Sequence, residues 1–193
     1  MSGKVPVGGL GTGVAPFIEQ LAAPTATPGG GSASAVAGAM AAALGSMVAG
    51  MSRGKKAYAQ FEPHLRQAIA RLTQLREELK AAIDADAESY NQVMAAYKQA
   101  KTSPNGVALI ESALKTATMI PLETAQKARE VASIVESLRP VTSPNMASDL
   151  TVALALSQAA VRGALSNVDI NLISIKDAGF VAGVRSTVEG WDG

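Results

Sequence analysis

A carboxylate occupies a position where a hydrophobic side chain is expected. Between residues 63 and 101 the apolar residues recur at spacings of three and four, which is typical of a helix with one buried stripe. They are Leu65, Ile69, Leu72, Leu75, Leu79, Ile83, Tyr90, Val93, Met94 and Tyr97. The step from Ile83 to Tyr90 skips one position of this stripe, and Asp86 fills that position. Asp84, two residues earlier, points to the opposite side of the helix.

A carboxylate on a buried stripe has two interpretations. Because burial of an unpaired charge is costly, Asp86 must be paired, protonated or placed beside a polar cavity. Desolvation favours the protonated carboxyl, which suits the residue to proton transfer near neutral pH. The alternative is structural: Asp86 makes an interhelical hydrogen bond that sets the register of the helices.

A glycine-rich segment precedes a predicted helix at residues 33–51. It reads Thr27-Pro28-Gly29-Gly30-Gly31-Ser32, and Ser32 is a suitable N-cap. The free N–H groups and the positive dipole of a helix start attract a carboxylate, a phosphate or a developing oxyanion. No Gly-Lys-Ser/Thr follows, so this is not a Walker loop. The alternative interpretation is a flexible connection that allows close helix packing.

The remaining polar candidates are Lys55, Lys56, Asn145, Ser148, Asp149, Asn167 and Asn171. The two lysines either hold an anionic tail or simply begin a solvated helix. Asp149 and Asn167 are separated by eighteen positions, which places them about 27 Å apart on a straight helix. They cannot contact one reacting atom, but they could line one groove or serve two sites of an oligomer. His64, Arg129 and Arg162 are interpreted as ordinary surface residues.

These side chains must be positioned by long helices. Apolar periodicity and breaker residues predict helices at 14–21, 33–51, 63–101, 107–138 and 144–176, with a bend or interruption at Pro121 and a weakly helical tail. Residues 1–13 are expected to be a flexible lead-in, and residues 14–193 a single helical domain. No strand-like alternation is present, so we expect an all-α antiparallel bundle of long helices.

The composition narrows the function. The 193 residues carry 17 Lys and Arg against 16 Asp and Glu, a net charge of +1, which gives no reason to expect a nucleic acid or a membrane surface as partner. The absence of Cys excludes disulfides, zinc ribbons, iron–sulfur sites and thiol nucleophiles, and a single His excludes a multi-histidine metal centre. We see no signal peptide and expect a cytoplasmic protein. A charged fraction of only 17% indicates that some surface is buried in an oligomer.

Taken in order, these motifs resemble the cyclodeaminase/cyclohydrolase family that acts on one-carbon folates. The resemblance extends over residues 15–180. It rests on 27–32, Gly45-Ser46-Met47-Val48, Gly54-Lys55-Lys56-Ala57-Tyr58, Asp84-Ala85-Asp86-Ala87-Glu88, Pro121-Leu122, Asn145 with Ser148-Asp149, and Asn167-Val168 with Asn171. The chain departs from the family at Ala26, where many members have Pro, and at Ala57, which interrupts the basic cluster. It also ends before a further C-terminal helix found in members of the family.

The resemblance implies a homodimer formed by helix packing, with folate sites at the subunit interface and no metal or cofactor besides the tetrahydrofolate substrate. It assigns the catalytic acid to Asp86. The expected substrate-binding residues are Pro28, Gly29, Gly30, Gly31, Ser32, Lys55, Lys56, Asn145, Ser148, Asp149 and Asn167. Two activities occur in the family: methenyltetrahydrofolate cyclohydrolase, favoured here because no formiminotransferase domain precedes the bundle, and formimidoyltetrahydrofolate cyclodeaminase. A catalytically silent or altered-substrate, folate-like ligand-binding dimer is the third interpretation.

Overall fold

Six α-helices form between residues 11 and 191, the part of the chain that the computed structural model describes. They are α1 (Gly11–Ala22), α2 (Gly30–Ser52), α3 (Glu62–Ala100), α4 (Gly106–Leu138), α5 (Ala147–Ile173) and α6 (Ala178–Val188). Short 3₁₀ segments at Lys56–Phe61, Arg139–Val141 and Pro144–Met146 connect the long helices.

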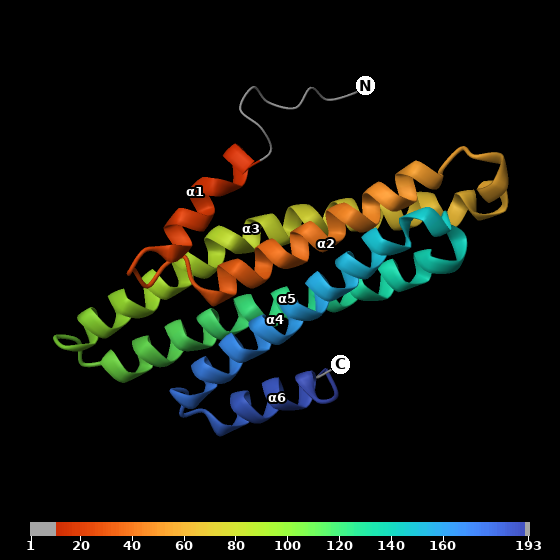
Figure 1. The fold of residues 1–193 in the computed structure, drawn as a ribbon. Helices are drawn as coiled ribbons and strands as arrows, with labels where there is room; N and C mark the ends of the chain where they lie inside the picture. The colour runs from red at the N-terminus through yellow and green to blue at the C-terminus, as the bar shows by residue number, and fades with distance from the viewer. Residues whose placement is uncertain (1–10, 192–193) are drawn as a thin grey trace.

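Helices α2 to α5 form an antiparallel four-helix bundle (Figure 1). Helix α2 packs against α3 and α5, and α4 packs against the same two helices. Helix α6 covers one end of α4 and α5 through a cluster that includes Leu122, Val168 and Val184. None of the residues of α1 is buried, and this helix lies outside the bundle. The prediction of an all-α bundle of long helices is confirmed.

Several boundaries differ from the predicted ones. Of the expected lead-in at 1–13, residues 1–10 lie outside the described part of the chain, and residues 11–13 already belong to α1. Helix α2 begins three residues earlier than predicted, at Gly30. Helix α4 continues through Pro121 without interruption. The weakly helical tail folds as α6 because it has an apolar face to bury against α4 and α5.

Small side chains place α2 in the core of the bundle. A Cβ atom on Gly45 would lie 2.8 Å from Val135 Cγ2 and 3.1 Å from Leu72 Cδ1, so α2 approaches α3 and α4 more closely than Ala would permit. Helix α2 has the length and hydropathy of a membrane span, and half of its most apolar window is buried inside the bundle. Its apolar composition is therefore accounted for by packing against three neighbouring helices.

The buried stripe of α3 ends earlier than predicted. Leu65, Leu72, Leu75 and Leu79 are fully buried, but Tyr90, Met94 and Tyr97 are 41%, 49% and 42% exposed. The reason is a difference in length, since α3 has 39 residues and α2 has 23. The first turn of α2 lies beside residues 83–86 of α3, so the part of α3 beyond Asp86 has no α2 to cover it.

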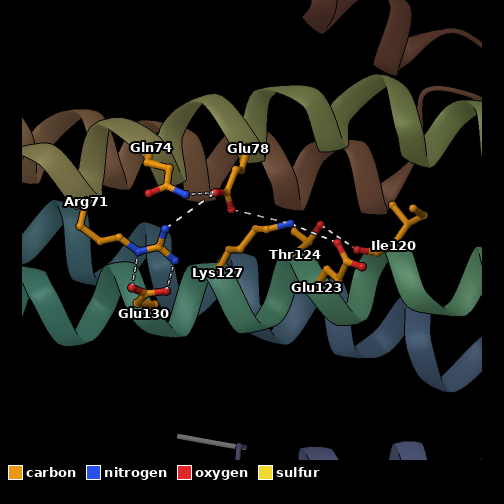
Figure 2. A network of polar contacts seen from close by, with 8 residues as sticks. All are labelled: Arg71, Gln74, Glu78, Ile120, Glu123, Thr124, Lys127 and Glu130. Carbon is orange, nitrogen blue, oxygen red and sulfur yellow. Dashed lines mark hydrogen bonds and ion pairs between the residues drawn. The ribbon is translucent and has the colours of Figure 1, made fainter.

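A network of charged side chains joins α3 to α4 (Figure 2). Arg71 donates two hydrogen bonds to Glu130, of 2.6 and 2.7 Å, and its guanidinium lies 3.7 Å from Glu78. Lys127 lies 4.0 Å from Glu78 and 3.2 Å from Glu123. The hydrogen bonds from Arg71 lower the pKa of Glu130 below its ordinary value, partial burial opposes this, and the charge of Arg71 adds to the lowering. Glu130 therefore stabilises the fold in its ionised form.

We predict that replacing Glu130 by Gln lowers stability in a pH-dependent way. The lowered pKa means that the contribution of Glu130 is complete above pH 4.5 and is lost as the pH falls through its folded-state value. Because both partners are partly exposed, we expect a loss of about 0.5–1 kcal/mol at pH 7. Urea unfolding at pH 7 and pH 3 measures it. Glu136→Gln, which breaks an exposed pair with Arg139, is the control and should change little. An equal loss in E130Q at both pH values would contradict the assignment.

Candidate active site

Asp86 of α3 binds the first turn of α2. Its Oδ2 accepts a hydrogen bond of 2.8 Å from the backbone N–H of Ser32, and the Ser32 hydroxyl lies 3.0 Å from the same oxygen. That hydroxyl also lies 2.9 Å from the carbonyl oxygen of Ile83. Gly29 is the N-cap residue of α2 and has no side chain to satisfy this turn. The carboxylate of Asp86 therefore supplies the acceptor and the negative charge that a helix start favours.

Gly31 makes this contact possible. A Cβ atom at Gly31 would overlap the carboxylate of Asp86, so only glycine allows the backbone of α2 to come this close. Gly31 and Ser32 are both buried. They stand behind the carboxylate and hold it in place, and neither lines the adjacent pocket.

The face of α3 that α2 leaves uncovered forms a pocket of about 380 Å³. Its lining comes from the loop before α2 (Ala26, Thr27, Gly29, Gly30), from α3 (Asp86, Ser89, Tyr90, Val93, Met94, Tyr97), from α4 (Leu114, Ala117) and from α5 (Asn167, Ile170, Asn171, Ser174). Asp86 is half-buried. Within residues 11–191 no hydrogen bond reaches its second oxygen, Oδ1. Oδ2 is thus held by the first turn of α2, Oδ1 lies against Gly31 without a hydrogen bond from the described residues, and the residue as a whole lines the pocket.

Two asparagines of α5 face the same pocket. Asn167 donates a 2.8 Å hydrogen bond to Gly163 of its own helix, and its side chain lies next to Gly30 at the start of α2. Asn171 donates a 3.1 Å hydrogen bond to the carbonyl of Ala117 on α4. These bonds fix both side chains, and each carboxamide retains an oxygen that can accept from a ligand.

Gly31 and Ser32 lie behind the carboxylate of Asp86, and the structure divides the other predicted site residues into two groups. Asp86, Gly29, Gly30 and Asn167 meet at the pocket, with Pro28 between Thr27 and Gly29 in the adjoining loop. The others are Lys55, Lys56, Asn145, Ser148 and Asp149, which belong to the α2–α3 connection, the α4–α5 connection or the first turn of α5. These segments lie at the opposite end of the bundle (Figure 1). The 23 residues of α2 separate the two ends, a distance of about 33 Å. Within one chain this second group does not reach the pocket.

Lys55 and Lys56 follow a turn that is held by hydrogen bonds to Glu62. Glu62 at the start of α3 accepts hydrogen bonds from Arg66 (2.8 Å), the backbone N–H of Gly54 (3.1 Å) and Arg53 (3.2 Å). These bonds, led by that of Arg66, lower the pKa of Glu62 to about 2. Gly54 has a φ of +70°, which glycine adopts without strain. Lys55 and Lys56 follow directly and are exposed.

Sequence reasoning placed Tyr90, Met94 and Tyr97 in the core, where their apolar spacing fits. A signal for their actual position was present, because Tyr90 follows Asp86 by one helical turn and Tyr97 follows Tyr90 by two. Because these side chains share a face of α3 with Asp86, they line the same pocket as that carboxylate.

Comparison with known proteins adds to this geometry. The family model described as formiminotransferase-cyclodeaminase matches residues 13–190. A methenyltetrahydrofolate cyclohydrolase of Methylorubrum extorquens is 37% identical over 178 residues, covering 90% of this chain and 86% of the relative. A formimidoyltransferase-cyclodeaminase of Gallus gallus is 37% identical over 168 residues, covering 85% of this chain and 31% of that longer protein. A crystal structure of formiminotetrahydrofolate cyclodeaminase from Thermotoga maritima superposes with a TM-score of 0.84 at 32% identity, covering 91% of this chain and 86% of that one.

We predict that Gly31→Ala destabilises the protein by about 1–3 kcal/mol, because the new methyl group must displace Asp86 or the start of α2. Gly50→Ala is the matched control on the same helix, since a Cβ there meets nothing within 4 Å. It should be neutral or stabilising by up to about 1 kcal/mol. Urea unfolding of the two variants measures the difference, and equal stabilities would refute the close approach at Asp86.

Proposed function

Because the chain belongs to the formiminotransferase-cyclodeaminase family, we propose that it hydrolyses 5,10-methenyltetrahydrofolate to 10-formyltetrahydrofolate, and catalyses the reverse cyclisation, in the pocket beside Asp86. The chain is an enzyme of one-carbon folate metabolism, as its relatives are. The cyclohydrolase activity in particular is supported by the relative from Methylorubrum extorquens, which is 37% identical over 90% of this chain.

One observation carries the proposal: a carboxylate lies at the wall of a pocket with one oxygen hydrogen-bonded and the other without a hydrogen bond from the described residues. Ser32 fixes Oδ2 of Asp86 at 2.8 Å, and we assign proton transfer to Oδ1, to which no residue between 11 and 191 hydrogen-bonds. A group held in this way needs no rearrangement when the proton moves. The volume of about 380 Å³ falls in the range of small-molecule sites.

The reaction requires a base and then an acid at the same place. In the methenyl substrate a cationic carbon bridges two nitrogens. Water adds to this carbon, and Asp86 takes one proton from the water through Oδ1. The tetrahedral adduct then breaks the bond between the carbon and the ring nitrogen, to which Asp86 returns the proton. The adduct's remaining hydroxyl proton leaves to solvent as the formyl C=O forms, so one proton is released overall.

The rest of the pocket suits a flat, polar-edged ring. Tyr90 and Tyr97 supply aromatic faces for stacking against the pterin. Asn167 and Asn171 offer carboxamides to its heteroatoms, and both are held by hydrogen bonds to the backbone.

Cyclodeamination is the second candidate, supported by the structural likeness to the cyclodeaminase of Thermotoga maritima. There one folate nitrogen attacks the formimidoyl carbon and its proton passes to the terminal nitrogen, and the bond from that carbon to the terminal nitrogen breaks once this nitrogen has been protonated again. Asp86 would then supply a proton to the departing ammonia. The same carboxylate would serve either reaction. The two activities would therefore differ in the substrate that is bound and not in the catalytic residue.

A second copy of the chain would complete the site. The substrate ends in glutamate carboxylates, yet no Lys or Arg is among the described residues that line the pocket. Lys55 and Lys56 are exposed at the far end of α2. Met40, Met47 and Met51 form an exposed stripe along α2 between the two ends.

A two-fold axis across the middle of this stripe pairs α2 with an antiparallel copy of itself. The end of α2 that carries Lys55 and Lys56 in one protomer then approaches Gly30 of its partner. The exposed apolar side chains of α1, which include Val14 and Ile18, extend the surface available for burial. We propose this homodimer as the active form, with Lys55 and Lys56 binding the carboxylate tail across the interface.

We predict that Asp86→Asn reduces kcat by at least about 100-fold, because the amide keeps an acceptor for Ser32 but cannot carry the proton. Loss of methenyltetrahydrofolate absorbance and release of ammonia from formimidoyltetrahydrofolate measure the two candidate reactions separately. Asp84→Asn, an exposed carboxylate two residues away, is the control and should retain activity. Undiminished turnover in D86N would remove Asp86 from the mechanism.

We also predict that hybrid dimers recover activity. The double variant Lys55→Gln/Lys56→Gln should raise KM by about tenfold, because the carboxylate tail loses its cations. A differently tagged D86N chain mixed with this double variant forms hybrids in which one of two sites has every wild-type residue. Purified hybrids should show about half of the wild-type rate at low substrate. A rate no higher than that of the parent variants would mean that the lysines do not act across an interface.

A further inference from the structure

A second pocket lies on α4 and α5, away from Asp86. It has a volume of about 200 Å³ and is lined by Arg129, Ala132, Gln158, Val161, Arg162 and Trp191. It shares no lining residue with the pocket at Asp86. Arg129 comes from α4 and Arg162 from α5, and Trp191 follows the end of α6.

The two arginines are unusual among those of the chain. Of the eight arginines, Arg53, Arg66, Arg71, Arg76 and Arg139 form ion pairs with glutamates. Within residues 11–191, Arg129, Arg162 and Arg185 form none. Two of these three unpaired guanidinium groups line the same small pocket, and no Asp or Glu is among its described lining residues.

Trp191 orients one of them. The guanidinium of Arg129 lies 4.3 Å from the centroid of the Trp191 ring, close enough for a cation–π contact. Stacking uses the face of the guanidinium and leaves the N–H groups at its edge free to donate. Gln158 stands one helical turn before Arg162 and adds an amide donor to the same wall.

Two like charges that face one pocket repel each other, and an anion between them converts this repulsion into attraction. The planar fork of an arginine matches the oxygens of a carboxylate or a phosphate. Ala132 and Val161 give the floor an apolar surface that can contact a short carbon chain.

We propose that this pocket is a binding site for a small oxyanion, the carboxylate or phosphate group of a metabolite, held between Arg129 and Arg162 and separate from the reaction pocket. An anion bound here would contact α4 and α5, the same two helices that carry Ala117 and Asn171 of the reaction pocket. The proposal does not depend on which folate reaction the enzyme catalyses.

Trp191 is the only tryptophan in the chain, so its fluorescence reports on this pocket alone. Inorganic phosphate and succinate are titrated separately at constant ionic strength, which distinguishes a phosphate site from a carboxylate site. We expect a saturable fluorescence change with at least one of them, and heat of binding by calorimetry with the same affinity. Arg129→Gln and Arg162→Gln should each weaken binding by about tenfold or more.

Arg185→Gln removes the third unpaired arginine, which does not line the pocket, and should bind as the wild type does. Circular dichroism and folate turnover without added anion check that each variant is folded. The proposal is overturned if neither anion gives a saturable signal, or if Arg185→Gln weakens binding as much as Arg162→Gln.

Discussion

The start of α2 is bound by a carboxylate that belongs to another helix, and the rest of the structure follows from this contact. Gly29 cannot cap the helix, so Asp86 accepts the N–H of Ser32 and fixes α2 against α3. Gly31 must be glycine for the two helices to approach this closely. The two interpretations of Asp86, as an interhelical contact and as a proton carrier, are compatible because a carboxylate has two oxygens. One oxygen holds the start of α2, and the other has no hydrogen bond within residues 11–191, while the residue also lines the pocket.

The same contact determines where the pocket lies. Helix α3 continues for fourteen residues beyond Asp86, to Ala100, whereas α2 begins beside that carboxylate. The uncovered face of α3 keeps the apolar spacing of a core stripe, yet Tyr90 and Tyr97 on it are exposed. A binding surface is thus made by ending one helix early, without a long loop or a separate domain. Apolar spacing alone cannot reveal this, since it records which residues share a face but not how far the neighbouring helix extends.

Much of the fold was therefore predictable from local patterns, and the site was predictable only in part. The long helices, the close packing of α2 and the importance of Asp86 follow from spacing and composition. The distance calculated between Asp149 and Asn167 from the rise of a helix also agrees with the structure, in which they lie toward opposite ends of α5. By contrast, Arg129 and Arg162 are separated by 33 positions on two helices, and nothing local shows that they line one pocket. Contacts of that kind depend on how α4 and α5 pack.

The distribution of charge around the reaction pocket suits the substrate proposed for it. The reacting carbon of a methenyl folate is cationic, whereas the tail of the molecule is anionic. A cation beside Asp86 would repel that carbon. The described lining holds no Lys or Arg, and its polar side chains other than Asp86 are neutral hydroxyls and carboxamides. Such a lining favours the cationic end of the substrate instead. The cations that the tail requires must then lie outside the pocket, and Lys55 and Lys56 are exposed at a distance of about one helix length. Separation of the two charges of the substrate thus gives a physical reason for the proposed site made by two chains.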